Sequence, residues 1–160
     1  MKELIKILLI SLVFVLGWTS SYVYSGTSLE NPSSFVSDEL ISPQDRISED
    51  DVYIFQDHIL IKISGASGAI YADTNSMDPV LDDGAIGLEI VPSSEDSIQV
   101  GDIVSFRTSW SNNLIVHRVI MIGEDDQGWY VVTKGDNSVF TDPGKLRFED
   151  IEYILVGVLY

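Results

Sequence analysis

From residue 52 onward, apolar and polar positions alternate in short segments. Runs rich in Val, Ile, Tyr and Phe are separated by clusters of Gly, Asp, Asn and Ser, which is the pattern of β-strands joined by turns. The candidate strands cover residues 53–63, 69–74, 85–90, 102–107, 114–122, 129–133 and 151–159. No long segment keeps a 3.6-residue period, so the pattern predicts a mainly β, antiparallel domain over residues 52–160.

Residues 4–24 follow a different pattern, because they are almost uniformly apolar. A helix of this length reaches about 31 Å, close to the hydrocarbon thickness of about 30 Å. Trp18, Tyr22 and Tyr24 fall where an interfacial aromatic belt is expected, and Lys2 and Lys6 lie at the opposite end of the span. The pattern predicts that residues 1–24 form a transmembrane anchor with its start in the cytoplasm and the following chain on the extracytoplasmic side.

A cleaved signal peptide is the alternative interpretation of this start, with Thr19 and Ser21 framing the cut. Both interpretations place the folded domain on the outer face of a cell membrane. Residues 25–51 are rich in Ser, Asp, Glu and Pro, which predicts an extended acidic linker between the anchor and the domain.

Charge narrows the classes of partner. The formal net charge is −16, and nucleic acid is excluded as a partner because phosphate binding needs clustered Lys and Arg. The chain has no Cys, which removes thiol nucleophiles and thiolate metal sites. One hypothesis is that the acidic surface reflects a saline environment.

Candidate catalytic residues lie at turns or strands and follow one another along the chain in the order Ser, His, Asp. Pro79 fixes its own φ and disfavours a helical Asp78, so the chain should turn just after Ser76 and leave its hydroxyl at an edge. His117 lies within the candidate strand 114–122, and Asp136 and Asp142 follow the next strand. This is the set of nucleophile, base and orienting acid that serine proteolysis requires.

The same residues carry a resemblance to a family. Four sequence boxes resemble those of type I signal peptidases: Ser76-Met77-Asp78-Pro79, Gly101-Asp102-Ile103-Val104, His117-Arg118-Val119 and Thr133-Lys134-Gly135-Asp136-Asn137. The match is to the archaeal and endoplasmic-reticulum branch, which has His where the bacterial branch has a catalytic Lys, and it spans roughly residues 70–158. The resemblance implies the coiled antiparallel β-fold of the signal peptidase/LexA-like type. It also implies a serine endopeptidase that removes signal peptides from secretory precursor proteins, cutting after small residues.

Roles follow from the resemblance position by position. It makes Ser76 the nucleophile, His117 the general base and Asp142 the acid that orients the imidazole. Asp136 takes a supporting role, and Thr74 with the N–H of Ser76 forms the oxyanion hole. Asn75 replaces the Gly usual between Thr74 and Ser76, and Ala85 replaces the Asp usual after Gly84. The resemblance implies neither a metal nor a cofactor.

Other interpretations remain open at this stage. Lys62 or Lys134 could serve as the base if buried, and Asp136, Ser138 and Asp142 could form a calcium loop, although the Gly and Glu of such a loop are missing. His58 is expected to be solvated. The alternative function is a catalytically inactive surface module that binds extended peptides, and a self-cleaving repressor-type relative is disfavoured by the membrane segment.

Overall fold

The structure, a computed structural model, describes Lys6 and residues 40–160. The predicted anchor, apart from Lys6, and the linker up to residue 39 therefore lie outside the described residues. Leu40–Tyr160 form one compact unit. Within the described part of the chain, no helix has the length and apolar character needed to cross a membrane.

Strands dominate this unit, and its only helices are single turns of 3-10 type within the described residues. The strands are β1 (Val52–Ile54), β2 (Ile59–Ile61), β3 (Ser67–Ile70), β4 (Ile86–Ile90), β5 (Ile103–Thr108), β6 (Ser111–Asp125), β7 (Gly128–Lys134) and β8 (Ile151–Leu159). The 3-10 turns are η1 (Glu49–Asp51), η2 (Glu95–Ser97) and η3 (Phe148–Asp150).

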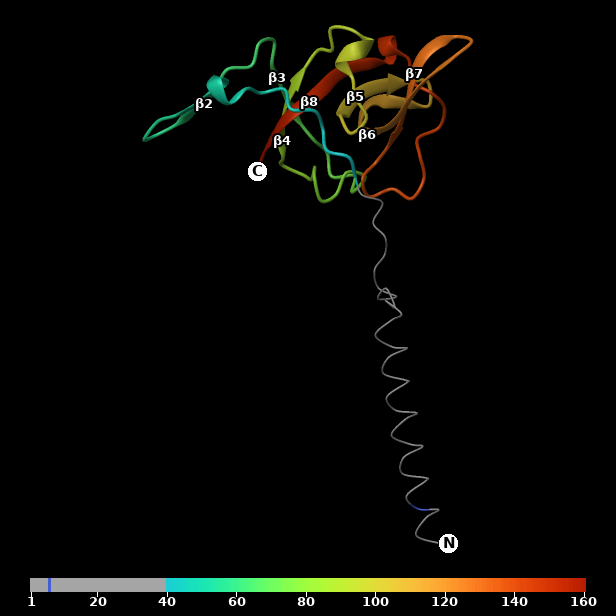
Figure 1. The fold of residues 1–160 in the computed structure, drawn as a ribbon, viewed down its shortest axis with the longest axis horizontal. Coiled ribbons are helices and arrows are strands. Elements are labelled where there is room, and N and C mark those ends of the chain that lie inside the picture. The colour runs from blue at the N-terminus through green and yellow to red at the C-terminus, as the bar shows by residue number, and fades with distance from the viewer. Residues whose placement is uncertain (1–5, 7–39) are drawn as a thin grey trace. The chain divides into compact units, whose positions relative to one another are not determined.

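Six of the strands form one antiparallel sheet in the order β3-β4-β8-β5-β6-β7. β1 and β2 pair only with each other, as a hairpin that projects from the side of the sheet (Figure 1). The prediction of a mainly β, antiparallel domain is confirmed.

Two of the predicted strands differ in extent. The candidate strand over residues 53–63 is a hairpin instead, because the polar residues between its apolar halves form a turn in which the Phe55 N–H donates to the carbonyl of His58 at 2.9 Å. The candidate strand over residues 69–74 begins at Ser67 and ends at Ile70, where its partner β4 begins at Ile86. Residues 71–74 therefore continue past the end of the ladder.

β6 is the longest strand and changes partner along its length. Its first part, Ser111 to Arg118, pairs with β5, and the part from Arg118 to Asp125 pairs with β7. The register shifts between Val119 and Met121. The residues just before Arg118 therefore have a ladder on one side only, and this open edge contains His117.

Two groups of buried apolar side chains stabilise the sheet. The larger group contains residues from β5, β6, β7 and β8, including Val104, Phe106, Val119, Val131 and Ile154. The smaller group combines Ile103 and Leu155 of the sheet with Met77 and Leu81. This second group ties the turn that follows Ser76 to the sheet.

Part of the predicted linker is held against the domain. The carboxylate of Asp102, which is fully buried, accepts from the Gln44 N–H at 3.0 Å and forms an ion pair with Arg46. The Arg46 guanidinium also donates to the carbonyl of Ser97 at 2.7 Å. Asp102 thus fixes residues 44–46 beside the start of β5.

Candidate active site

Ser76 lies at the start of a turn between β3 and β4, as Pro79 predicted. The next residue, Met77, is 4% exposed, and its carbonyl accepts from the N–H groups of Val80 and Leu81 at 2.9 and 3.0 Å. Burying Met77 anchors the turn, so the half-buried Ser76 stays at its edge. Its hydroxyl forms a hydrogen bond with Thr74 Oγ1 at 3.1 Å.

Asn75 adopts a left-handed backbone conformation, with φ of 56°. Residues with a Cβ avoid this region, and Asn tolerates it better than most. The departure from the usual Gly therefore keeps a backbone shape that Gly would also supply. The Asn75 carbonyl accepts a hydrogen bond from Asn137 Nδ2 at 2.9 Å.

The loop after β7 closes over the Ser76 turn. The Asn137 N–H donates to the Ser76 carbonyl at 3.0 Å. A Cβ on Gly135 would lie 2.5 Å from that carbonyl oxygen and 3.1 Å from His117 Nε2. Gly135 therefore lies between the main chain of Ser76 and the imidazole, where a larger residue would push them apart.

His117 stands on the open edge of β6, opposite Val104 of β5. Its Nδ1 lies 2.7 Å from Asp142 Oδ2, and the two side chains are 12% and 13% exposed. The ring also packs edge-on against Phe106, with centroids 6.2 Å apart. A carboxylate only accepts hydrogen bonds, so the proton of this contact belongs to Nδ1, and in the neutral ring Nε2 is then an acceptor on the side of Gly135.

Asp142 has two donors on the same carboxylate oxygen. The Thr133 hydroxyl donates to Oδ2 at 2.6 Å in addition to His117. Burial acts to raise the pKa of Asp142, but hydrogen bonds from His117 and Thr133 and the charge of His117 outweigh it and hold the pKa below its usual value. Asp142 is therefore suited to remain an anion beside the imidazole.

Asp136 is bonded to Arg118, the residue after His117. The guanidinium donates to both carboxylate oxygens, at 2.8 and 2.6 Å, and the two side chains are 6% and 1% exposed. Arg118 also donates to the carbonyl of Gly101 at 2.8 Å and to that of Ile41 at 3.2 Å. The bidentate pair fixes the loop after β7 to β6 next to the imidazole.

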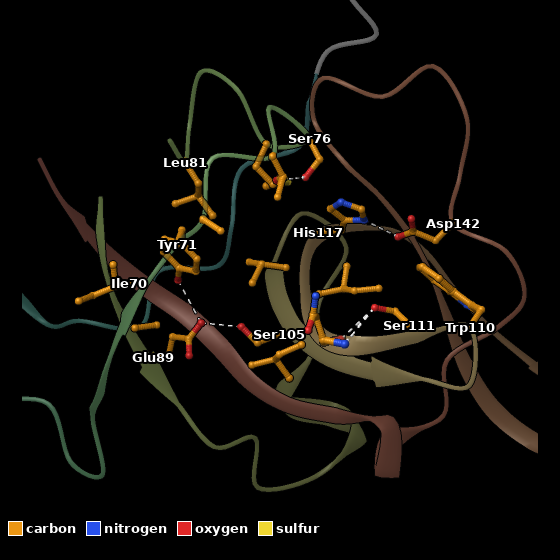
Figure 2. Close-up of a pocket in the computed structure, with 18 of the residues that line it drawn as sticks. Ile70, Tyr71, Ser76, Leu81, Glu89, Ser105, Trp110, Ser111, His117 and Asp142 are labelled. Atoms are coloured by element: carbon orange, nitrogen blue, oxygen red, sulfur yellow. Dashed lines mark hydrogen bonds and ion pairs between the residues drawn. The ribbon is translucent and has the colours of Figure 1, made fainter. Parts of the chain in front are cut away.

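A cavity of about 520 Å³ brings these side chains together. Thr74, Ser76, His117 and Asp142 all line it, and Figure 2 shows Ser76 and His117 on neighbouring walls. Within the described residues no hydrogen bond joins the Ser76 hydroxyl to His117; that hydroxyl is bonded to Thr74 instead.

The other candidate bases and the calcium loop find no support in the site. Lys62 Nζ lies on the β1–β2 hairpin against the Tyr53 ring, and neither Lys62 nor Lys134 lines the cavity. His58 is exposed and pairs with Asp57. In the described part of the chain no group of three His, Asp or Glu side chains is placed to hold a metal ion.

Two contributors to the site were not singled out from the sequence. Thr133 was noted only as part of a box, although the alternation along β7 puts it on the same buried face as Val131. Asn137 was likewise part of a box, and no local pattern shows that it holds Ser76. Both act through contacts between segments far apart in the sequence.

Comparison with known proteins finds relatives among signal peptidase catalytic subunits. The signal peptidase complex catalytic subunit SEC11C of Homo sapiens is 37% identical over 87 residues, which are 53% of this chain and 45% of the relative. A second human relative, SEC11B, is 36% identical over 86 residues, covering 53% of this chain and 51% of its own length. The SEC11 subunit of Yarrowia lipolytica is 27% identical over 111 residues, which cover 67% and 63% of the two chains.

The aligned region is limited. The chain spans about half the length of the curated human relatives it matches. No protein-family model matches the chain, and no solved structure matches it. Over about half of its length the chain is nevertheless homologous to SEC11 catalytic subunits, and the resemblance to the endoplasmic-reticulum branch of the type I signal peptidases is confirmed.

Proposed function

We propose that this chain is a membrane-anchored serine endopeptidase that removes signal peptides from exported precursor proteins, cutting after small residues. The observation that carries the proposal is the hydrogen bond of 2.7 Å between His117 and Asp142 in a cavity that Ser76 also lines. Homology to SEC11 subunits supports the reaction class, and it does not favour the alternative of an inactive peptide-binding module.

In the proposed reaction Ser76 Oγ attacks the scissile carbonyl while His117 Nε2 accepts the hydroxyl proton. Asp142 holds Nδ1–H, which keeps the imidazole in the tautomer that can act as a base and stabilises the imidazolium. The imidazolium then protonates the leaving amine, and water repeats the sequence to release the acyl group. Catalytic hydrogen bonds are often completed only in the complex with substrate, so substrate binding would redirect the Ser76 hydroxyl from Thr74 to His117.

Thr74 and the Ser76 N–H are the proposed donors to the oxyanion. When the Ser76 hydroxyl has lost its proton to His117 and bonded to carbon, the Thr74 hydroxyl is released from the bond of 3.1 Å that it makes in the structure. It can then donate to the negative oxygen that develops on the carbonyl. Removing one such donor typically costs about 10²–10³ in kcat.

Two open strand edges border the cavity and suit an extended substrate. Residues 71–74 run past the end of the β3–β4 ladder, and β6 has an open edge before Arg118. Residues of both segments line the cavity. Main-chain hydrogen bonds to a peptide strand would supply binding without large side chains, which agrees with small residues at the cut.

Anchoring and cell location belong to the same proposal. The apolar residues 4–24 would hold the domain at the extracytoplasmic face of the membrane, in contact with lipid, where secretory precursors are also confined. The finer fold, the coiled antiparallel sheet of the signal peptidase/LexA-like type, is proposed from the resemblance together with the observed antiparallel strand order.

The test is cleavage of a precursor protein by the full chain reconstituted in membranes. Ser76→Ala should abolish cleavage, because it removes the hydroxyl that is proposed to attack the scissile carbonyl. Ser93→Ala, a change on an exposed loop, is the matched control and should cleave like the wild type. Undiminished cleavage by Ser76→Ala would refute the proposal.

A further inference from the structure

The segment that leads into the domain, residues 41–46, is held to the sheet by a buried carboxylate. We call this segment the strap, and Figure 1 shows it in cyan. Asp102 is fully buried, and its oxygens accept from the Gln44 N–H at 3.0 Å and from the Arg46 guanidinium. The Arg46 side chain is only 13% exposed. Charge-assisted hydrogen bonds are roughly twice as strong as neutral ones, so this pair fixes the end of the strap.

The other end of the strap contacts the residue that follows His117. The carbonyl of Ile41 accepts from Arg118 Nη1 at 3.2 Å, and the same Nη1 donates to the carbonyl of Gly101 at 2.8 Å. Gly101 has a φ of 101°, and a Cβ there would lie 2.8 Å from the Ile41 carbonyl oxygen. Gly at this position therefore lets the strap approach β5 and β6 closely enough to reach Arg118.

Arg118 connects the strap to the loop after β7. While Nη1 bonds to the strap, Nε and Nη2 donate to the two oxygens of Asp136 at 2.8 and 2.6 Å. The guanidinium group is planar and rigid, so the positions of the Ile41 carbonyl and the Asp136 carboxylate are linked. Both side chains of the ion pair are buried, so solvent cannot readily replace either contact. A displaced strap should therefore loosen the loop.

This loop holds the two reacting groups of the proposed site. The Asn137 N–H donates to the Ser76 carbonyl, and Gly135 lies between that carbonyl and His117 Nε2. Among the described residues no hydrogen bond joins the Ser76 hydroxyl to His117, so the reactive contact still has to form when substrate binds. A misplacement of about 1 Å can cost on the order of 10²-fold in rate, so the position of the loop should matter for turnover.

We propose that the strap is a positioning element of the proposed active site, and that Arg46 is the residue that locks it in place. With the strap docked, the Arg118–Asp136 pair holds the loop after β7 against the reacting groups. With the strap released, the fold remains but these groups are held less well. The strap is not part of the cavity wall, so its release should leave substrate binding largely as it is. The role of the strap in turnover rests on the proposed peptidase function.

The experiment measures kcat and KM for cleavage of a precursor protein by the full chain in non-ionic detergent. Arg46→Met keeps the length of the side chain and removes the pair with Asp102. It should lower kcat by roughly tenfold to a hundredfold, as expected for misplaced reacting groups, while KM stays nearly unchanged. Arg46→Lys restores the positive charge and should recover part of the loss. Rates are compared at a temperature at which circular dichroism shows each variant to be folded.

Two control variants separate the strap from general effects of charge and stability. Arg107→Met removes a cation from an exposed ion pair and should leave kcat unchanged. Phe148 packs edge-on against Trp129, with ring centroids 6.4 Å apart, and does not line the cavity. Phe148→Leu should therefore lower the Tm while kcat stays at the wild-type value.

A second change in the strap carries the test if Arg46→Met does not fold. Gln44→Pro removes the N–H that donates to Asp102 and keeps Arg46, so it should lower kcat in the same direction by a smaller factor. Wild-type kcat in both strap variants would overturn the proposal. So would a loss of kcat that Phe148→Leu reproduces at an equal loss of Tm.

Hydrogen exchange tests the strap without any turnover. The Asn137 N–H is bonded to the Ser76 carbonyl, so its exchange rate reports how firmly the loop is held. In Arg46→Met this amide should exchange faster by roughly tenfold or more, as for the loss of a hydrogen bond to a charged group. The Val131 amide, which is bonded to the Leu146 carbonyl, is the reference and should keep its wild-type rate.

The two measurements distinguish failure of the strap from failure of the proposed function. If the wild type cleaves no precursor, the proposed function fails, and faster exchange at Asn137 in Arg46→Met still supports the strap. If the wild type cleaves the precursor and Arg46→Met changes neither kcat nor the exchange at Asn137, the strap alone is refuted.

Discussion

At the residue scale, the proposed chemistry depends on one oxygen atom. Asp142 Oδ2 accepts hydrogen bonds from His117 Nδ1 at 2.7 Å and from the Thr133 hydroxyl at 2.6 Å. Thr133 is 1% exposed and lies on β7, next to the loop that carries Asp142. It is a positioning residue, because it acts on the imidazole only through the carboxylate.

Thr133→Val should therefore lower kcat while leaving KM nearly unchanged. The change removes one donor and keeps the shape of the side chain, so the pKa of Asp142 should rise and its orientation should loosen. A loss of one hydrogen bond to a charged group corresponds to roughly 10- to 100-fold in rate. Thr133→Ser, which restores the hydroxyl, is the control and should recover most of the activity; equal losses in both variants would indicate a packing role instead.

The lowered pKa of Asp142 also predicts how stability depends on pH. A carboxylate whose folded-state pKa lies below its unfolded value of about 3.9 stabilises the fold above that value and loses the contribution as pH falls through the folded pKa. The stability advantage of the wild type over Asp142→Asn should therefore shrink as the pH falls below about 5. Urea unfolding at a series of pH values measures it, and a difference that does not change with pH would contradict the assignment.

At the scale of elements, the site is assembled by joining β6 to the loop after β7. The Arg118–Asp136 pair makes this connection within one residue of His117. Removing one partner of a buried pair leaves the other charge uncompensated, which costs about 3–5 kcal/mol. Asp136→Asn should lower the free energy of unfolding by about this amount, as measured by urea denaturation.

A second ion pair in the same domain provides the matched control. Arg107 and Glu152 lie 2.5 Å apart, but their side chains are 60% and 33% exposed. Solvent screens such pairs, so Glu152→Gln should cost less than about 1 kcal/mol. If the two variants lost similar stability, burial would not be what makes the Arg118 pair important.

The strands that the sequence predicted well are those with local signals. β8 has the predicted bounds, and β4, β5 and β7 differ from the predicted bounds by one residue at one end or both ends, because Val- and Ile-rich runs between turn residues reveal a strand directly. β1 and β2 were merged into one strand, since a turn of Gln56, Asp57 and His58 lacks Gly or Pro. The supporting role predicted for Asp136 stays a prediction, although the structure pairs this residue with Arg118. The contact of Glu89 with Tyr71 and Ser105 was not predicted, because only the strand order brings these side chains together.

At the scale of the whole molecule, acidic residues greatly outnumber basic ones. Nine Lys and Arg face 25 Asp and Glu, which gives the formal net charge of −16. Several of the cations are already used in ion pairs, including Arg46, Arg118 and Arg147. Acidic groups outnumber basic groups by 16, so most carboxylates have no basic group of their own to pair with, and their mutual repulsion opposes the compact state.

Salt should stabilise this chain. Screening shortens the range of charge repulsion from about 30 Å at 0.01 M to about 3 Å at 1 M salt, so the Tm of the full chain in non-ionic detergent should rise steadily with NaCl over this range. Sucrose is the control, because it favours compact states without screening charge. If charge repulsion is the cause, the Tm should rise most steeply with NaCl below about 0.15 M. Sucrose at the same osmolarity should change the Tm little. Maximal stability at the lowest salt would show that the acidic surface is not adapted to a saline environment.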